Sequence, residues 1–280
     1  MKKQRSKFTT IFLVAILMVG VCLLLYPTLS DWWNSFHQSR AIASYVEHVE
    51  ELDSATYEQL LSNARIYNET LVGKSGRFDM TNAEQEKYES LLNVAGNGMM
   101  GYLEIPSIKC QLPIYHGTDE ATLQIAAGHI EGTSLPVGGE GTHCVLSGHR
   151  GLPSAQLFTN LDKLVAGDTF TIHVLNETLT YEVDQIRIVL PDELDNLEIE
   201  EGKDYCTLVT CTPYGINSHR LLVRGYRIEN PNDAQTARIT NDALQIDPLI
   251  VAPVVAMPLL LVLLILLLVP ARKGKKGNQK

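Results

Sequence analysis

The sequence of 280 residues lacks the spacings that usually mark a zinc site. It contains five cysteines and eight histidines, but no Cys-x-x-Cys pair and no His-x-x-x-His pair. This absence argues against a metal centre. No internal repeat is visible either, which argues against a solenoid or propeller architecture.

Acidic residues are absent from both ends of the chain. All 32 of them lie between two apolar runs, 8–26 and 250–269. Nine of the 23 basic residues lie in the end segments, so 14 basic residues face 32 acidic ones in the middle. A nucleic-acid-binding domain needs a basic face, so this charge balance argues against one. The acidic middle suits either solubility or basic protein partners.

The two apolar runs are each long enough to cross about 30 Å of hydrocarbon as a helix. The first could instead be a cleaved signal peptide, but no small-x-small cleavage site follows it, which favours a retained helix. Basic residues fill the end segments 1–7 and 270–280. The positive-inside rule therefore predicts a two-pass protein of the cell membrane, with both termini cytoplasmic and the middle extracellular.

The extracellular part is predicted to begin with a helical segment, 27–97. Apolar residues recur at helical spacing over 39–67, with a break expected at Asp53-Ser54. Residues 68–81 are polar and contain two glycines, which predicts a loop.

From Gly98 onward, short alternating stretches are separated by turn residues. A short helix is expected at 123–127, and strands are expected at 100–106, 108–115, 143–147, 169–174, 179–190, 205–210 and 220–228. Many short strands with turn signals favour a closed or nearly closed β-barrel. The predicted fold class is therefore mainly β, with a barrel over 98–229, the helices as an appendage and a polar linker over 230–249.

Cys211 ends one of these strands, in the stretch Thr207-Leu208-Val209-Thr210-Cys211, and Arg220 follows nine residues later. Cysteine is a strong nucleophile as a thiolate or beside a proton-sharing partner, and His149 is the candidate partner. Arginine cannot act as a base, but it can hold a developing oxyanion. The set suggests acyl transfer through a thioester. The alternative is that all three residues are structural.

The other extracellular cysteines, Cys110, Cys144 and Cys206, are interpreted as small buried apolar residues. A disulfide among them, such as Cys110–Cys144, stays open. A structural role is expected for the histidines at 116, 129, 143 and 219.

Longer stretches around these residues resemble a known family. Thr-Leu-Val-Thr-Cys with the downstream Arg220 is similar to the sortase signature, and Ser147-Gly148-His149-Arg150 resembles the family's histidine segment. The extended forms, TLVTCTPYGINSHRLLVRG and GTHCVLSGHRGLPSAQLFTNLDKL, resemble class C sortases, the pilin polymerases of Gram-positive bacteria. The resemblance covers 99–228, and the two-span layout matches as well.

The resemblance implies a role for each residue. Cys211 would attack the threonine carbonyl of a Leu-Pro-x-Thr-Gly-like sorting signal, and His149 would protonate the leaving glycine amine. Arg220 would hold the oxyanion or clamp the signal, with Arg224 as its rival. A lysine amine of a pilin would then resolve the thioester into an isopeptide bond, with no cofactor or metal. The partners would be pilins or surface proteins that carry such a signal.

A lid loop is also implied by the resemblance. Class C enzymes often carry an Asp-Pro-aromatic motif over the cysteine, in a loop that would correspond to 73–81 here. This loop contains Arg77-Phe78-Asp79-Met80 and no proline. Phe78, Asp79 or Met80 is therefore expected to cover the site, but more loosely. The alternative is an ordinary exposed loop.

Three other functions stay open at this stage. The chain could be a sortase that attaches surface proteins to the cell wall. It could be an inactive membrane-anchored scaffold that only binds sorting signals. It could also be a hydrolase, in which water rather than an amine resolves the thioester.

Overall fold

The computed structural model describes residues 2–230 of the chain. The second predicted span, 250–269, and the tail, 270–280, lie outside the described residues, as does the predicted linker apart from Asn230. The described chain contributes to two compact units, one containing residues 2–30 and the other residues 31–230.

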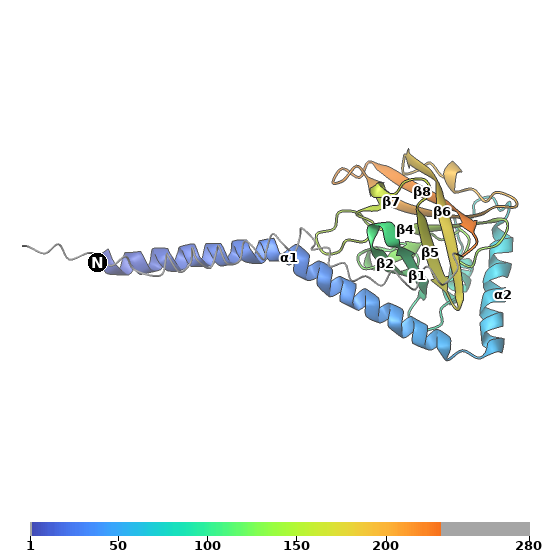
Figure 1. Ribbon diagram of the computed structural model, residues 1–280, viewed down its shortest axis with the longest axis horizontal. Coiled ribbons are helices and arrows are strands. Elements are labelled where there is room, and N and C mark those ends of the chain that lie inside the picture. Colours follow the sequence, from blue (N-terminus) through green and yellow to red (C-terminus); the bar gives the residue numbers. More distant parts are fainter. Residues whose placement is uncertain (1, 231–280) are drawn as a thin grey trace, which may run out of the picture. The chain divides into compact units, whose positions relative to one another are not determined.

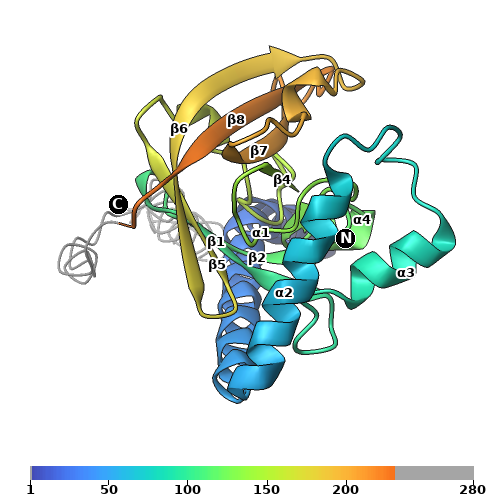
Figure 2. The ribbon, with the colours of Figure 1, turned by 90° about the vertical axis from the view of Figure 1, so that its right-hand side faces the viewer.

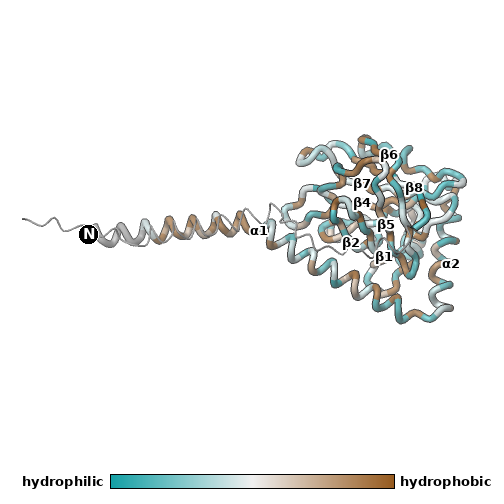
Figure 3. Tube along the Cα trace, viewed as in Figure 1, coloured by the Kyte–Doolittle hydropathy of each residue, from teal (hydrophilic) through white to brown (hydrophobic). Residues whose placement is uncertain are grey.

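The long helix α1 (Lys2–Glu50) contains the first predicted span. From Thr9 onward it is long and apolar enough to cross a membrane, and it is the one such helix in residues 2–230. Figure 3 shows the hydrophobic stretch in its N-terminal part. A membrane-spanning helix near the N-terminus therefore fits its length and composition.

The predicted break at Asp53-Ser54 is confirmed, because α1 ends at Glu50 and α2 (Ser54–Leu71) begins after Asp53. The Asp53 carboxylate accepts a hydrogen bond from the Thr56 N–H at 2.8 Å, as an N-cap does. Figure 1 shows the corner that the two helices make.

Helix α2 is longer than the sequence pattern predicts, so the loop expected from residue 68 begins only at residue 72. The reason lies in tertiary contacts of Asn68, which is buried. Its side-chain amide donates to the carbonyl oxygen of Leu135 at 3.1 Å and accepts from the Leu135 N–H at 2.7 Å. These bonds hold the last turn of α2 on the connection between β3 and β4. After the loop, α3 (Asn82–Ser90) starts with a capping box between Thr81 and Glu84.

The predicted β-barrel is confirmed, and it closes through eight strands within the described residues. Its order is β1-β2-β3-β4-β7-β8-β6-β5. Figures 1 and 2 show the barrel from two sides, with α2 beside it. The strands are β1 (Met99–Ile105), β2 (Cys110–His116), β3 (Ala127–His129), β4 (Thr142–Ser147), β5 (Thr169–Val174), β6 (Glu177–Val189), β7 (Asp204–Thr212) and β8 (His219–Ile228). Short 3-10 turns lie at Pro106–Ile108, Leu161–Lys163 and Asp195–Leu197.

The helix expected at 123–127 is wrong in position. The helix α4 (Glu120–Leu123) begins earlier, because the Asp119 carboxylate accepts hydrogen bonds from the N–H groups of Ala121 and Thr122 and caps it. Residues 127–129 instead form β3, which pairs parallel with β2 and antiparallel with β4. A strand of three residues is too short to produce a readable alternation.

Buried apolar side chains form two clusters. The larger one fills the barrel and extends to α1, α2 and α3. The smaller one consists of Val145, Val189, Leu197, Val209 and Leu222. Side chains alternate between the two faces of a strand, so this smaller set lies on the outer face of the barrel, and we call it the outer cluster.

Candidate active site

Cys211 lies one residue before the end of β7, and the strand that carries it is deeply buried. Leu208, Val209 and Thr210 are 0%, 6% and 1% exposed, whereas Cys211 is half-buried. Pro213 has no N–H to continue the ladder, so the strand ends at Thr212. The sequence thus places a thiol at the point where a buried strand reaches the surface.

Arg220 lies directly opposite Cys211 on the neighbouring strand β8, because the two residues are Cα partners in the antiparallel ladder. Directly opposite residues project to the same face of a sheet. The guanidinium group donates to the carbonyl oxygens of Asn217 at 3.3 Å and His219 at 3.1 Å. Among the described residues it forms no ion pair with a carboxylate. Its charge is therefore not already matched by an acidic side chain.

The rival Arg224 is engaged elsewhere. Its guanidinium makes two hydrogen bonds to the Asp184 carboxylate, at 3.1 and 2.7 Å, and it stacks 4.1 Å from the Tyr205 ring. It also lies 3.7 Å from the Glu200 carboxylate. Four residues along a strand correspond to about 13 Å, so Arg224 is too far from Cys211 to touch the same substrate atoms as Arg220.

His149 follows the end of β4, which runs parallel to β7. The ladder between the strands continues one residue past β4, because the Gly148 N–H donates to the carbonyl oxygen of Val209 at 3.0 Å. The Thr210 hydroxyl donates to the Gly148 carbonyl oxygen at 2.8 Å. His149 therefore leaves the sheet at the same end as Cys211. The structure brings the three predicted residues to one end of the β4–β7–β8 ladder.

The histidine segment is held by Phe158, through a backbone hydrogen bond to His149 and close packing of the ring against Gly148. The Phe158 N–H donates to the His149 carbonyl oxygen at 3.1 Å. A Cβ on Gly148 would lie 2.6 Å from the Phe158 ring, which is fully buried and cannot move aside. A glycine at position 148 therefore allows the backbone of the histidine segment to pack closely against the Phe158 ring.

Gly148→Ala is expected to destabilise the fold by about 1–3 kcal/mol, since the added methyl group overpacks the site against Phe158. It should also displace His149 and slow any reaction that uses its imidazole. Thermal unfolding and a rate measurement on the same preparation would check both effects.

The matched control is the double variant Gly148→Ala with Phe158→Leu. The second change removes the ring that the methyl group meets, so the double variant should lose less stability than the two single changes together. Strict additivity would contradict the proposed clash.

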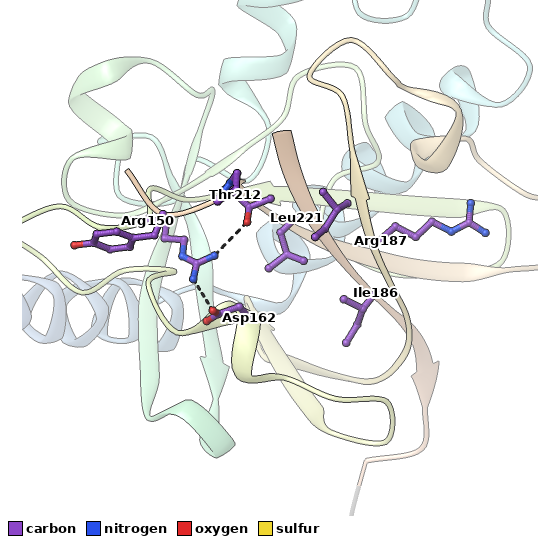
Figure 4. A pocket seen from close by; sticks show the side chains of 9 residues that line it. Arg150, Asp162, Ile186, Arg187, Thr212 and Leu221 are labelled. Carbon is purple, nitrogen blue, oxygen red and sulfur yellow. Dashed lines mark hydrogen bonds and ion pairs between the residues drawn. The ribbon is translucent and has the colours of Figure 1, made fainter. Parts of the chain in front are cut away.

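Arg150 also ties the histidine segment to the cysteine strand. Its guanidinium donates to the Thr212 hydroxyl at 3.4 Å and forms an ion pair with the Asp162 carboxylate. Figure 4 shows both contacts in a pocket of about 690 Å³. Apolar side chains of Ile186 and Leu221 also line this pocket. Since Thr212 and Cys211 project to opposite faces of β7, the pocket lies on the reverse side of the strand from the thiol.

A carboxylate that the sequence did not reveal lies beside His149. Glu120, at the start of α4, has its Oε2 atom 3.7 Å from the His149 Nε2 atom. Its side chain is 76% exposed and that of His149 is 27% exposed. The two residues are 29 positions apart in sequence, so no local pattern could have paired them. Glu120 can support positive charge on the imidazole, with the modest strength of a solvated contact.

Three of the four histidines expected to be structural make contacts that fit this role. His143 bonds to the Glu198 carbonyl oxygen at 2.8 Å and to the Thr207 hydroxyl at 2.7 Å, and burial lowers its pKa to about 4. His116 and His129 bond to backbone carbonyl oxygens. His219 contacts its neighbour Ser218.

The predicted lid loop is attached to the connection between β6 and β7. Arg77 is 4% exposed, and its guanidinium donates to the Leu197 carbonyl oxygen at 2.8 Å. Leu197 belongs to the outer cluster, as does Val209, two residues before Cys211. The loop is thus attached to a residue that packs on the outer face of the barrel, which is the face that carries Cys211. Asp79 is exposed and Phe78 and Met80 are half-buried, and none of their described contacts reaches Cys211.

The disulfide considered between Cys110 and Cys144 is not formed, since all five cysteines are free. The barrel order explains this, because β3 separates β2 from β4. The Cys110 thiol instead donates to the Leu157 carbonyl oxygen at 3.6 Å. Burial raises the pKa of this thiol to about 12, which makes it a poor nucleophile.

Comparison with known proteins adds an independent line of support. A family model described as a sortase domain matches residues 103–228. The crystal structure of sortase C1 from Streptococcus agalactiae is 51% identical, with a TM-score of 0.64, over 69% of this chain and 100% of that one. Sortase C from Streptococcus pneumoniae is 44% identical, with a TM-score of 0.59, over 68% and 97%. A lid mutant of sortase A from Corynebacterium diphtheriae is 42% identical, with a TM-score of 0.60, over 66% and 100%.

Proposed function

Because this chain belongs to the sortase family and class C sortases are among its structural neighbours, we propose that it is a membrane-anchored cysteine transpeptidase that joins pilin subunits. The proposed donor is a Leu-Pro-x-Thr-Gly-like sorting signal on a pilin. The proposed acceptor is a lysine amine on the next subunit.

One observation carries the proposal most strongly. Cys211, His149 and Arg220 converge at one end of the β4–β7–β8 ladder, although two of them are 62 positions apart in sequence. A nucleophile, a proton carrier and a fixed cation are the groups that acyl transfer through a thioester requires. Such a set at the open end of a strand favours catalysis over an inactive binding scaffold.

In the proposed first step, the Cys211 thiol passes its proton to His149, and the sulfur attacks the carbonyl carbon of the threonine in the signal. The carbonyl oxygen takes up negative charge, and Arg220 donates hydrogen bonds to it. When the tetrahedral intermediate collapses, the bond to glycine breaks and His149 gives a proton to the leaving amine. The product is a thioester between Cys211 and the pilin.

In the proposed second step, the lysine amine of another pilin attacks the thioester carbon. Its proton passes to His149, the bond to the Cys211 sulfur breaks and an isopeptide bond is formed. The thioester retains the free energy of the cleaved peptide bond, so the proposed reaction needs no cofactor. His149 acts as an acid in the first step and as a base in the second, so it carries the proton before the glycine amine leaves and again after the second step, with the Glu120 carboxylate 3.7 Å from its Nε2 atom.

Two features support the pilin reaction over the anchoring of surface proteins to the cell wall. The structural work on the Streptococcus pneumoniae relative concerns pilin substrate specificity, and that relative matches 68% of this chain. The second feature is the loop over 73–81, which is attached through Arg77 to the Leu197 carbonyl oxygen. A loop held near the barrel face that carries Cys211 suits an enzyme whose cysteine is shielded between substrates. Wall anchoring and hydrolysis stay as outcomes of the experiment.

The experiment combines the full-length protein in detergent micelles with a pilin that carries the sorting signal. Covalent pilin multimers that depend on one acceptor lysine would support pilin joining. Transfer only to a short cell-wall peptide amine would favour wall anchoring, and release of shortened pilin without multimers would favour hydrolysis. Signal binding without any covalent product would contradict all of the enzyme proposals.

The lid is proposed to restrain access to Cys211. Replacing Phe78, Asp79 and Met80 together by alanine is then expected to raise the rate of Cys211 alkylation by iodoacetamide several-fold. The smaller side chains would obstruct the approach of the reagent to the thiol less. Intact mass measured over time, followed by peptide mapping, would give this rate.

Lys74→Ala is the control for the lid experiment. Lys74 lies in the same loop but is exposed, and it forms a surface ion pair with Glu84, so its loss should change little. An alkylation rate that is unchanged in the triple variant would show that the loop is an ordinary exposed one.

The membrane arrangement is also part of the proposal. Helix α1 supplies an N-terminal span by length and composition. The basic residues at both ends of the sequence favour cytoplasmic termini and an extracellular barrel. Cysteine accessibility to a membrane-impermeant reagent in whole cells would test this orientation.

A further inference from the structure

Two buried cysteines face each other inside the barrel. Cys144 on β4 and Cys206 on β7 are Cα partners in the parallel ladder. Directly paired residues point to the same face, and both side chains belong to the core that fills the barrel. They are 2% and 0% exposed, and both thiols are free. The catalytic proposal uses neither of them.

The spacing of the two strands suits a bond between these side chains. Neighbouring strands lie about 4.8 Å apart. Disulfides join residues whose Cα atoms are about 4.4–6.8 Å apart. The backbone therefore already lies within the required range.

The other cysteines of the barrel are poor partners for this pair. Cys110 is on β2, and β3 separates it from β4. Cys211 is five residues beyond Cys206, about 16 Å along the strand, and projects to the opposite face. The register thus selects one pair of thiols.

The surroundings of Cys144 favour thiol chemistry. Burial opposes its ionisation, but hydrogen bonds with the Cys206 thiol and the His129 side chain together lower the pKa of the Cys144 thiol. Burial and the bond with Cys144 raise the pKa of the Cys206 thiol. His129 is held in place by the Tyr88 hydroxyl at 2.9 Å and the Ser134 carbonyl oxygen at 2.9 Å. A thiol with a lowered pKa beside a second thiol is the arrangement found in redox-active dithiols.

We propose that Cys144 and Cys206 form a redox site that closes reversibly to a disulfide between β4 and β7. These strands carry the segments that end in His149 and Cys211, so the bond would fasten the two halves of the proposed catalytic site to each other. It would lie inside the barrel, on the face away from the Cys211 thiol.

The oxidant belongs to the class of disulfides, such as oxidised glutathione. The Cys144 thiolate attacks one sulfur of the oxidant, forms a mixed disulfide and releases one reduced thiol. The Cys206 thiol then loses its proton to solvent, and the resulting thiolate attacks the Cys144 sulfur. The Cys144–Cys206 bond forms and the second reduced thiol leaves. Two protein thiols are oxidised, and one external disulfide is reduced to two thiols.

The test uses the full-length protein in detergent micelles. It is incubated with oxidised glutathione a few degrees below its melting temperature, where local opening admits the reagent. It is then unfolded, alkylated and weighed. We expect three alkylated cysteines instead of five, and a single cross-linked pair of peptides containing Cys144 and Cys206. We also expect the melting temperature to rise by about 5–10 °C, because the bond closes a loop of some 60 residues. Dithiothreitol should reverse both changes.

Cys144→Ala and Cys206→Ala should each abolish the cross-link and the rise in melting temperature. Cys110→Ala is the matched control and should keep both. Five alkylated cysteines after oxidation would overturn the proposal, as would a cross-link that maps to Cys110 or Cys211. None of these outcomes depends on transpeptidase activity, so the redox site and the proposed function can fail separately.

Discussion

The full-length Cys211→Ala variant is expected to form no covalent adduct with a sorting-signal peptide, a loss of at least about 10³-fold against the unchanged protein. The alanine methyl group cannot form a thioester. The fold should persist, because Cys211 is half-buried at a strand end and its removal leaves the inner core untouched. Intact mass after mixing with the peptide measures the adduct, and thermal unfolding verifies the fold.

Cys110→Ala is the matched control for this experiment. Its thiol has a pKa raised by burial to about 12 and bonds to the Leu157 carbonyl oxygen. The adduct should therefore be retained at close to its full amount. An adduct that survives Cys211→Ala, or that maps to another cysteine, would refute the thioester proposal at Cys211.

Arg220→Lys should slow adduct formation by about 10²–10³-fold, the usual loss when one donor to an oxyanion is removed. Lysine keeps the charge but lacks the planar fork that can donate two hydrogen bonds at once. The backbone contacts of Arg220 with Asn217 and His219 are weak anchors, so the fold should tolerate the change. Single-turnover kinetics with saturating peptide would separate this loss from weaker binding.

Arg224→Lys serves as the comparison. It removes the same fork from the same face of β8, about 13 Å further along. Its partners are Asp184 and Tyr205, so the expected cost is lower stability, with the reaction rate changed less than about threefold. If Arg224→Lys slowed adduct formation by about 10²–10³-fold and Arg220→Lys lowered only the stability, the oxyanion role would belong to Arg224.

Much of the barrel could be predicted from sequence because its signals are local. The strands that carry Cys211 and Arg220 are separated by a short turn-rich segment, so their antiparallel pairing follows from position alone. The break after Asp53 and the start of α3 after Thr81 each depend on a side-chain cap that acts within three residues. Such features need no knowledge of distant parts of the chain.

The remaining features arise from long-range pairing, which a single sequence does not reveal. The parallel register of β4 and β7 brings His149 beside the cysteine strand and sets Cys144 opposite Cys206. Glu120 reaches His149 only because α4 lies near the end of β4. Arg77 lies in a segment whose sequence predicts only a polar loop, yet its guanidinium is buried and donates to the Leu197 carbonyl oxygen, 120 positions away.

The parallel pairing of β4 with β7 also determines at which stage of folding His149 and Cys211 come together. Parallel neighbours need a long crossover, and here β5 and β6 lie between them in sequence. Contacts of such wide sequence separation form late in folding, since loop closure must precede them. His149 and Cys211 should therefore meet only after the β5–β6 hairpin has formed. In pulse-labelling hydrogen exchange, the Gly148 amide should gain protection after the amides of that hairpin. A chain still in synthesis would therefore lack the arrangement of Cys211 and His149 on which the proposed reaction depends.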